Sequence, residues 1–140
     1  MTPIDRLLAE HEISRLITRF ALLNDAGDWD SVAAMFAVDG RFVRPAGGDA
    51  IVGREAILAS FASRPPRKSR HLIANIVVDL ASADAATARS SMLLYTAPAG
   101  EAAASSPALI GGFRDRLARA SDGWRFAERV GFVDFKVDFK

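Results

Sequence analysis

Two side chains in this 140-residue sequence have types suited to moving a proton, the imidazole of His71 and the carboxylate of Asp25. A carboxylate beside an imidazole fixes the tautomer of the ring and makes it a better base. Such a pair could remove a proton next to a carbonyl group and return it to a leaving hydroxyl. The same two residues could instead form a satisfied polar contact without chemistry. The residue types leave both interpretations open.

His71 belongs to a segment rich in isoleucine and valine, residues 70–80, which is expected to form a strand. Residues four apart on a strand point to the same side, so Asn75 is predicted to share the face of His71, together with Ile73 and Val77. A face that mixes polar and apolar side chains is typical of a pocket lining. Asn75 is therefore predicted to hold an oxygen atom of a ligand.

Arg129 is a second candidate for holding a ligand oxygen. It alternates with Arg125 and Ala127 on an expected strand, so the three share one face. If that face is inward, the guanidinium could bind a carboxylate or a phenolate, and if it is outward, Arg129 is an ordinary surface charge. The apolar wall of the same pocket is predicted to come from Phe20, Phe36, Phe61 and Met92.

The composition argues against several classes of partner. The chain has 18 basic and 17 acidic side chains and no basic block, so nucleic-acid binding is not predicted. No stretch approaches the ~20 apolar residues of a membrane span, and the charged N-terminus differs from a signal peptide, so a cytoplasmic protein is expected. With no cysteine, two distant histidines and no glycine-rich phosphate cradle, neither a metal nor another cofactor is predicted.

Three helices are predicted in the first half of the chain. Apolar residues that recur every three or four positions after Pro3 predict a long helix that ends at Gly27. Asp28 suits the N-cap of a second helix over residues 29–37. A third helix is expected over residues 54–62.

The remaining segments have strand patterns. The Asp-Gly pair at positions 39–40 predicts a turn into a strand over residues 41–44, which pairs with residues 51–52 as a hairpin. Four longer strands are predicted over residues 70–80, 85–96, 109–120 and 124–137. The low-complexity segment 97–107 is expected to be an extended hairpin loop. This order predicts a single α+β domain over residues 1–140, with the helices on one face of an antiparallel sheet.

Four short motifs resemble those of the SnoaL-like branch of the nuclear-transport-factor-2-like superfamily. That branch commonly has an Arg-Tyr-Ala segment followed by Asp and Gly-Asp, a Gly-Arg-Glu helix start, an Arg-His strand with a later Asn, and a closing Gly-Trp-Arg strand with Glu-Arg. The corresponding residues here are Arg19-Phe20-Ala21 with Asp25, Gly27 and Asp28; Gly53-Arg54-Glu55 with Ile57; Arg70-His71 with Asn75; and Gly123-Trp124-Arg125 with Glu128-Arg129.

The resemblance implies a cone-shaped α+β barrel, in which about three N-terminal helices pack on a strongly curved, mainly antiparallel sheet. It leaves the function open, since this fold carries cyclases, dehydratases, isomerases and non-catalytic binding domains. Related dehydratases pair a helix aspartate with a strand histidine, here Asp25 and His71. They frequently have a tyrosine at the position of Phe20, whose hydroxyl polarises the substrate carbonyl, and phenylalanine cannot donate that hydrogen bond.

Two functions are therefore considered. The first is a cofactor-independent dehydratase, isomerase or cyclase that acts by acid-base chemistry on a hydrophobic cyclic substrate, with His71 as base and Asp25 as its orienting partner. The second is a non-catalytic ligand-binding or assembly domain, which Phe20 favours. Both predict a small apolar or aromatic organic ligand. Apolar residues on both faces of strand 70–80 further predict a homodimer through the outer sheet face, because helices can cover only one face.

Overall fold

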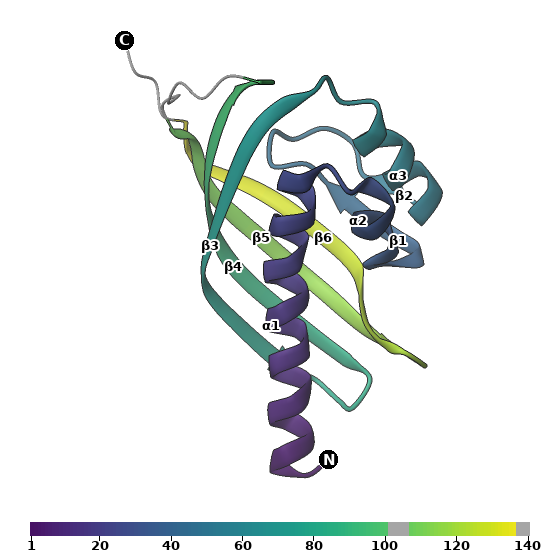
Figure 1. Cartoon of the computed structure of the whole chain (residues 1–140). Helices are drawn as coiled ribbons and strands as arrows, with labels where there is room; N and C mark the ends of the chain where they lie inside the picture. Colours follow the sequence, from purple (N-terminus) through teal and green to yellow (C-terminus); the bar gives the residue numbers. More distant parts are fainter. Residues whose placement is uncertain (101–106, 137–140) are drawn as a thin grey trace.

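Three helices and a six-stranded sheet form the computed structural model, which describes residues 1–100 and 107–136 (Figure 1). The helices are α1 (Pro3–Ala26), α2 (Trp29–Ala34) and α3 (Arg54–Ala62). The strands are β1 (Phe36–Val43), β2 (Ile51–Val52), β3 (Arg67–Leu80), β4 (Ala85–Pro98), β5 (Pro107–Ala120) and β6 (Gly123–Lys136). They lie in the order β2-β1-β6-β5-β4-β3, antiparallel except for β1 with β6. The predicted α+β cone is confirmed, with its sheet left open rather than closed.

Helix α1 begins and ends at residues that satisfy its terminal backbone groups. Thr2 Oγ1 accepts from the backbone N–H of Asp5, and the Asp5 carboxylate accepts from the N–H of Thr2, which together form a capping box. Gly27 ends the helix with a φ of 72°, a left-handed conformation that glycine adopts without steric cost. The predicted end of the helix is confirmed, and it places Asp25 in the last turn.

Helix α1 crosses the concave face of the sheet, while α2 and α3 lie at one end beside β1 and β2 (Figure 1). Ile13, Ile17 and Phe20, spaced three or four apart, are buried on its sheet-facing side. Within residues 1–100 and 107–136, no helix is both long and apolar enough to cross a membrane.

Helix α2 is shorter than predicted, and the turn expected at residues 39–40 is wrong. The chain passes from α2 directly into β1, whose Phe36 is fully buried and pairs with Phe126 on β6. The register shifts between Phe36 and Arg41, and the Phe36 carbonyl accepts from Arg54 Nε at 3.0 Å and Nη2 at 2.6 Å. Burial of Phe36 and this side-chain partner therefore outweigh the local turn preference of the Asp-Gly pair.

The remaining predicted elements are found with small changes at their ends. Helix α3 spans the predicted residues, and β1 pairs with β2 as a hairpin. Strand β3 begins at Arg67, three residues earlier than predicted, and β4 reaches Pro98. The predicted end of the last strand at residue 137 lies outside the described residues, as does the centre of the loop expected over residues 97–107.

Two adjacent glycines allow close contact between strands in the middle of the sheet. A Cβ atom on Gly111 would overlap the backbone carbonyl of Phe132 on β6, and one on Gly112 would overlap that of Ser90 on β4. The register of β5 against β6 shifts between Ile110 and Gly111. Glycine, which has no Cβ atom, therefore permits this close approach of the neighbouring strands.

A bulge in β3 changes which side chains face the helices. Asn75 has a φ of 54°, and the register against β4 shifts between Ala74 and Val77. His71, before the bulge, is half-buried, whereas Asn75 and Val77 are exposed, and Asn75 Nδ2 donates to Ser91 Oγ at 3.3 Å. The prediction that Asn75 and Val77 share the face of His71 is wrong, because strict alternation fails across a bulge.

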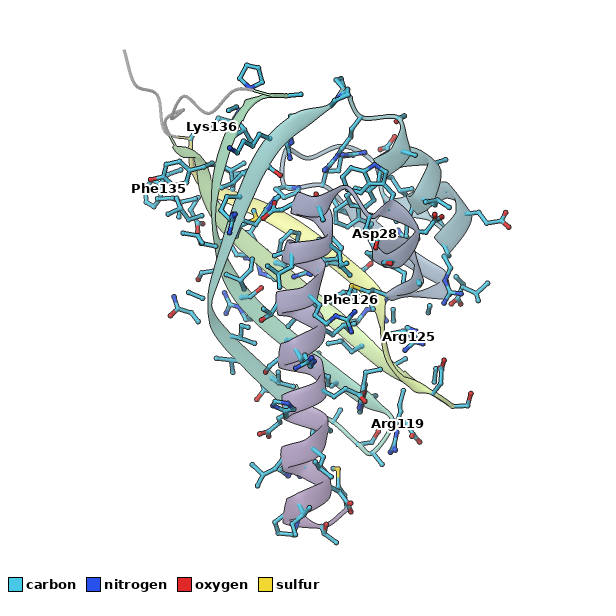
Figure 2. The ribbon with its side chains drawn as sticks, in the orientation of Figure 1. Asp28, Arg119, Arg125, Phe126, Phe135 and Lys136 are labelled. Atoms are coloured by element: carbon cyan, nitrogen blue, oxygen red, sulfur yellow. The ribbon has the colours of Figure 1, made fainter. Side chains whose placement is uncertain are left out.

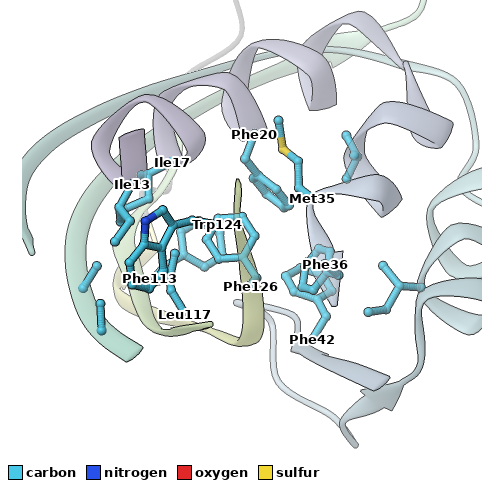
Figure 3. Close-up of a cluster of buried hydrophobic side chains, with 14 of the residues drawn as sticks. Ile13, Ile17, Phe20, Met35, Phe36, Phe42, Phe113, Leu117, Trp124 and Phe126 are labelled. Atoms are coloured by element: carbon cyan, nitrogen blue, oxygen red, sulfur yellow. The ribbon is translucent and has the colours of Figure 1, made fainter. Parts of the chain in front are cut away.

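The core is an aromatic cluster centred on Phe20 (Figure 3). The centre of this ring lies 5.8–6.2 Å from the ring centres of Phe36, Phe42, Phe61, Phe113 and Phe126. Four of these contacts are edge-to-face, the geometry that the charge distribution of aromatic rings favours. The end of α1 is thereby fixed against β1, α3 and the middle of the sheet.

Candidate functional site

A cavity of about 340 Å³ lies where the last turns of α1 pass the end of β1 and the start of β3. Its apolar walls come from Phe20, Phe42, Met92, Leu94, Leu109 and Phe113. Its polar side chains are Asn24, Arg44, Arg64, Arg67 and His71. An apolar cavity with a few convergent polar groups is the usual form of a small-molecule site. A larger hollow of about 650 Å³ lies between the first turns of α1 and the β5–β6 turn, with no histidine among its lining residues.

The structure brings His71 and Asp25 into contact. His71 Nδ1 lies 2.5 Å from Asp25 Oδ1, and the His71 backbone N–H donates to Asp25 Oδ2 at 2.9 Å. Ser69 Oγ donates to Asp25 Oδ1 at 2.9 Å. Only 8% of the His71 side chain and 12% of the Asp25 side chain are exposed. The last turn of α1 is therefore held to the start of β3 through one carboxylate.

These contacts keep Asp25 ionised. Partial burial acts to raise its pKa, but hydrogen bonds from the ring and backbone of His71, the charge of His71 and the Ser69 hydroxyl outweigh burial and hold the pKa below its usual value of 3.8. An ionised carboxylate can only accept, so a neutral His71 ring must carry its proton on Nδ1. The lone pair then lies on Nε2 of a ring that lines the cavity. This tautomer is the one that a base in the cavity requires.

Asp25 lies behind the imidazole rather than beside the ligand space. It is not among the residues that line the His71 cavity, and it borders a second cavity of about 340 Å³ next to Trp29. The segment from Arg64 to Arg67 lines both cavities. Asp25 can therefore orient the His71 ring without contacting a molecule in the first cavity.

Apart from Arg129, the other predicted site residues divide into three groups. Phe20 and Met92 line the cavity, as expected for apolar wall residues. Phe36 and Phe61 are fully buried in the aromatic core and are absent from the cavity lining. Asn75 lies on the exposed side of β3 because of the bulge, so the structure does not bring it to the cavity.

Arg129 is fully buried, so it is neither a surface charge nor a cavity residue. Its Nε atom lies 3.2 Å from Asp115 Oδ1, and its guanidinium carbon lies 4.4, 3.8 and 4.6 Å from the ring centres of Phe20, Phe113 and Phe126. Burial raises the pKa of Asp115 to about 6 and lowers that of Arg129 to about 10, and each opposite charge offsets only part of this effect. The pair supports two aromatic walls of the cavity from behind.

The sequence analysis missed several polar residues of the site. Asn24 could have been found, because it follows Phe20 by four positions and so shares its helix face. Ser69 precedes His71 by two positions on one strand face, which also suggests a shared site. Arg64 and Arg67 flank a Pro-Pro pair whose pattern indicates only the end of a helix, and nothing local shows that they meet Arg44 at one cavity.

The described residues contain no group of three histidine, cysteine, aspartate or glutamate side chains placed to hold a metal ion. The polar side chains at the cavity are the imidazole of His71 and the amide and guanidinium groups around it.

Several solved structures share this fold. A candidate scytalone dehydratase from Novosphingobium aromaticivorans is 20% identical, with a TM-score of 0.85 over 99% of this chain and 93% of its own. Rv3472, a protein of unknown function from Mycobacterium tuberculosis, solved as an Asp-to-Asn variant, is 29% identical, with a TM-score of 0.82 over 98% of this chain and 79% of its own. ActVI-ORFA from Streptomyces coelicolor is 25% identical, with a TM-score of 0.76 over 89% of this chain and 96% of its own.

None of the curated proteins matches this sequence. The model of the SnoaL-like domain matches residues 5–130, which include Asp25 and the His71 strand. This chain therefore belongs to the SnoaL-like domain family.

Proposed function

We propose that this protein is a cofactor-independent enzyme that performs acid-base chemistry on a hydrophobic cyclic ketone, as a dehydratase-type lyase, an isomerase or a cyclase. The observation that carries the proposal is the His71 ring at the cavity wall, with Nδ1 held by an ionised Asp25. The candidate scytalone dehydratase and ActVI-ORFA support it as proteins of the same fold.

The chemistry follows from the free ring nitrogen. Nε2 of His71 takes a proton from the carbon next to the substrate carbonyl, and the resulting imidazolium is stabilised by the Asp25 carboxylate. In a dehydration, the imidazolium returns this proton to the hydroxyl on the β-carbon, which leaves as water as the double bond forms. In an isomerisation, the proton returns to a different carbon of the same substrate.

The developing enolate oxygen needs a hydrogen-bond donor, and Asn24 is placed to supply it. Its Oδ1 accepts from Arg64 Nη1 at 3.3 Å, so the NH₂ end of the amide is the part that can donate to a ligand. Asn24 lines the cavity on the helix turn next to Phe20. This donor takes the role that the tyrosine of related dehydratases has at the position of Phe20.

Proton abstraction can be tested without the natural substrate. We expect the protein to accelerate deuterium exchange at the carbon next to the carbonyl of cyclic aryl ketones such as 1-tetralone and 1-indanone, followed by NMR in D₂O. His71→Ala is expected to remove this acceleration, because Nε2 is the proposed base. His11→Ala is the matched control, since His11 is the other histidine and lies exposed on α1.

Exchange that continues unchanged in His71→Ala would contradict the assignment of His71 as base. If the ketones bind but do not exchange in the parent protein, the non-catalytic alternative is supported instead.

That alternative, a binding domain of the same fold, is favoured by one observation. No side chain that lines the cavity, among the residues described, carries a hydroxyl group, and Phe20 packs into the aromatic core. Phe20 therefore offers no donor at the position where related dehydratases have the tyrosine that polarises the substrate carbonyl.

We also propose a homodimer through the outer face of the sheet, opposite α1. Large apolar side chains are exposed on four strands, with exposed fractions of 52% for Leu72, 38% for Tyr95, 39% for Ile110 and 65% for Phe135. Figure 2 shows Phe135 on the side of the sheet away from the helix. Light scattering is expected to give twice the 15.0 kDa chain mass at micromolar concentration, and Leu72→Asp is expected to reduce it. A monomer mass for the parent protein would refute the dimer.

A further inference from the structure

Three arginines from two segments that are distant in the sequence line the His71 cavity. Arg44 follows β1, Arg64 follows α3 and Arg67 begins β3. Their hydrogen-bond partners are neutral. Arg44 Nη2 donates to the backbone carbonyl of Ser60 at 3.1 Å and to its hydroxyl, and Arg64 Nη1 donates to the amide oxygen of Asn24.

None of these three arginines forms an ion pair with a carboxylate within residues 1–100 and 107–136. Burial, followed by the positive charges of Arg44 and Arg67, lowers the pKa of Arg64 to about 10. Burial also lowers the pKa of Arg67, the charge of Asp25 acts to raise it, and that of Arg44 lowers it further. Asp25 forms no ion pair with any of the three, and its oxygens accept hydrogen bonds from His71 and Ser69 instead.

Like charges that converge on a partly buried cavity repel one another when the cavity holds no anion. The same charges become favourable when an anion enters, and this converts the repulsion into selectivity for charged ligands. Arginine suits this role because its planar guanidinium forms paired hydrogen bonds with carboxylate and phosphate oxygens.

We propose that the ligand of this cavity is an organic anion, with an apolar ring system beside His71 and a carboxylate or phosphate group bound by Arg44, Arg64 and Arg67. This inference rests on the proposed function, because it names the substrate class of the same site. The apolar walls of Phe20, Met92 and Phe113 receive the ring, and the volume of about 340 Å³ lies within the range of small-molecule sites.

Binding of three probes that share one ring tests the charge requirement. The probes are 2-naphthoate, 2-naphthyl phosphate and the neutral 2-naphthamide, with dissociation constants measured by NMR titration at pH 8 and low salt. At least one anion is expected to bind at least about tenfold more tightly than the amide, as for a charge-assisted hydrogen bond. The ratio of the two anions shows which acidic group the site prefers. High salt is expected to reduce the preference, because the arginines are only partly buried.

Two variants and a control locate the effect. Arg64→Gln and Arg67→Gln are each expected to reduce the preference for the anion over the amide by about tenfold. Arg70→Gln makes the same charge change at an exposed position of β3 outside the cavity, and is expected to keep the preference. If Arg64→Gln does not fold, Arg64→Lys retains the charge but not the paired hydrogen bonds, and is expected to keep only part of the preference.

Equal affinity for the anions and the amide would overturn the proposal, as would an unchanged preference in both glutamine variants or no binding of any probe at millimolar concentration. The proposed acid-base function fails separately. In His71→Ala the anion preference is expected to persist while deuterium exchange is lost, whereas Arg70→Gln, at an exposed position outside the cavity, is expected to keep both.

Discussion

His71→Ala is expected to lower kcat by about 10²- to 10⁴-fold, the usual contribution of a positioned general base. The reason is geometric. The ring of His71 lines the cavity, and the contact of Nδ1 with Asp25 leaves the lone pair on Nε2, the ring nitrogen that does not contact Asp25. The measurement is the rate of proton exchange or of substrate turnover with saturating ligand. Unchanged ligand affinity would show that the loss belongs to the chemical step.

Asp25→Asn is expected to cause a loss of similar size by a different route. An amide can present its NH₂ group to Nδ1, and the ring would then carry its proton on Nε2. A protonated Nε2 cannot accept the proton of the substrate. The double variant of His71 and Asp25 is expected to lose little more activity than the less active of the two single variants, because the two residues act as one unit. Losses that multiply would contradict this unit, and so would full activity of Asp25→Asn.

A structural role for Asp25 can be separated from its role in orienting the ring. Because the pKa of Asp25 lies below 3.8 in the folded protein, its interactions contribute stability above that pH and lose it as the pH falls further. Asp25→Asn is therefore expected to be less stable than the parent at pH 7, with a smaller difference near pH 3. Nitrogen-15 NMR of the His71 ring, which reports the proton on Nδ1, is the readout that a purely structural role would not change.

Arg129→Met is expected to lower the free energy of unfolding by about 3–5 kcal/mol, the largest change in stability predicted for this protein. The substitution removes the positive charge opposite the Asp115 carboxylate. Both residues are buried, and their charged atoms have no hydrogen-bond partner among the residues described. It also removes the contact of the guanidinium with the faces of Phe20 and Phe113, which adds to the loss. Urea denaturation monitored by tryptophan fluorescence measures the change.

Removing both charges is expected to have a much smaller effect. A variant that combines Arg129→Met with Asp115→Leu leaves no buried charge, and replacements of this kind are often neutral or stabilising. If the double variant is as unstable as Arg129→Met alone, packing against the aromatic rings, and not the uncompensated carboxylate, explains the loss.

The pH dependence of Arg129→Met follows from the same carboxylate. With a folded pKa of about 6 and an ordinary value of 3.8, Asp115 holds more protons in the folded state than in the unfolded state between these pH values. Its contribution to stability therefore falls as the pH rises through this window. Without Arg129 the pKa of Asp115 is expected to rise further, so Arg129→Met should be less destabilising at pH 5 than at pH 8. If Arg129→Met lost the same unfolding free energy at pH 5 and at pH 8, the charge of Asp115 would not be the cause of the loss.

Most of the secondary structure was predictable because its signals are local. A capping residue acts on backbone groups within one turn. Asp28 and Gly27 therefore indicate helix boundaries independently of what the helices pack against. Alternating side chains likewise predict strands. Where the local signal competed with burial, at the Asp-Gly pair within β1, burial decided the outcome.

Local patterns were sufficient to predict the fold class, the ends of α1 and α3, and the two residues of the proposed acid-base pair. Which other residues meet them depends on tertiary packing. The bulge at Asn75 turned that side chain outward, and the burial of Arg129 made it a partner of Asp115 rather than of a ligand. Arg44 and the segment from Arg64 to Arg67, which are distant in the sequence, came to line one cavity for the same physical reason. Long-range contacts depend on how the sheet bends and where the helices pack across it, and residue spacing does not encode either.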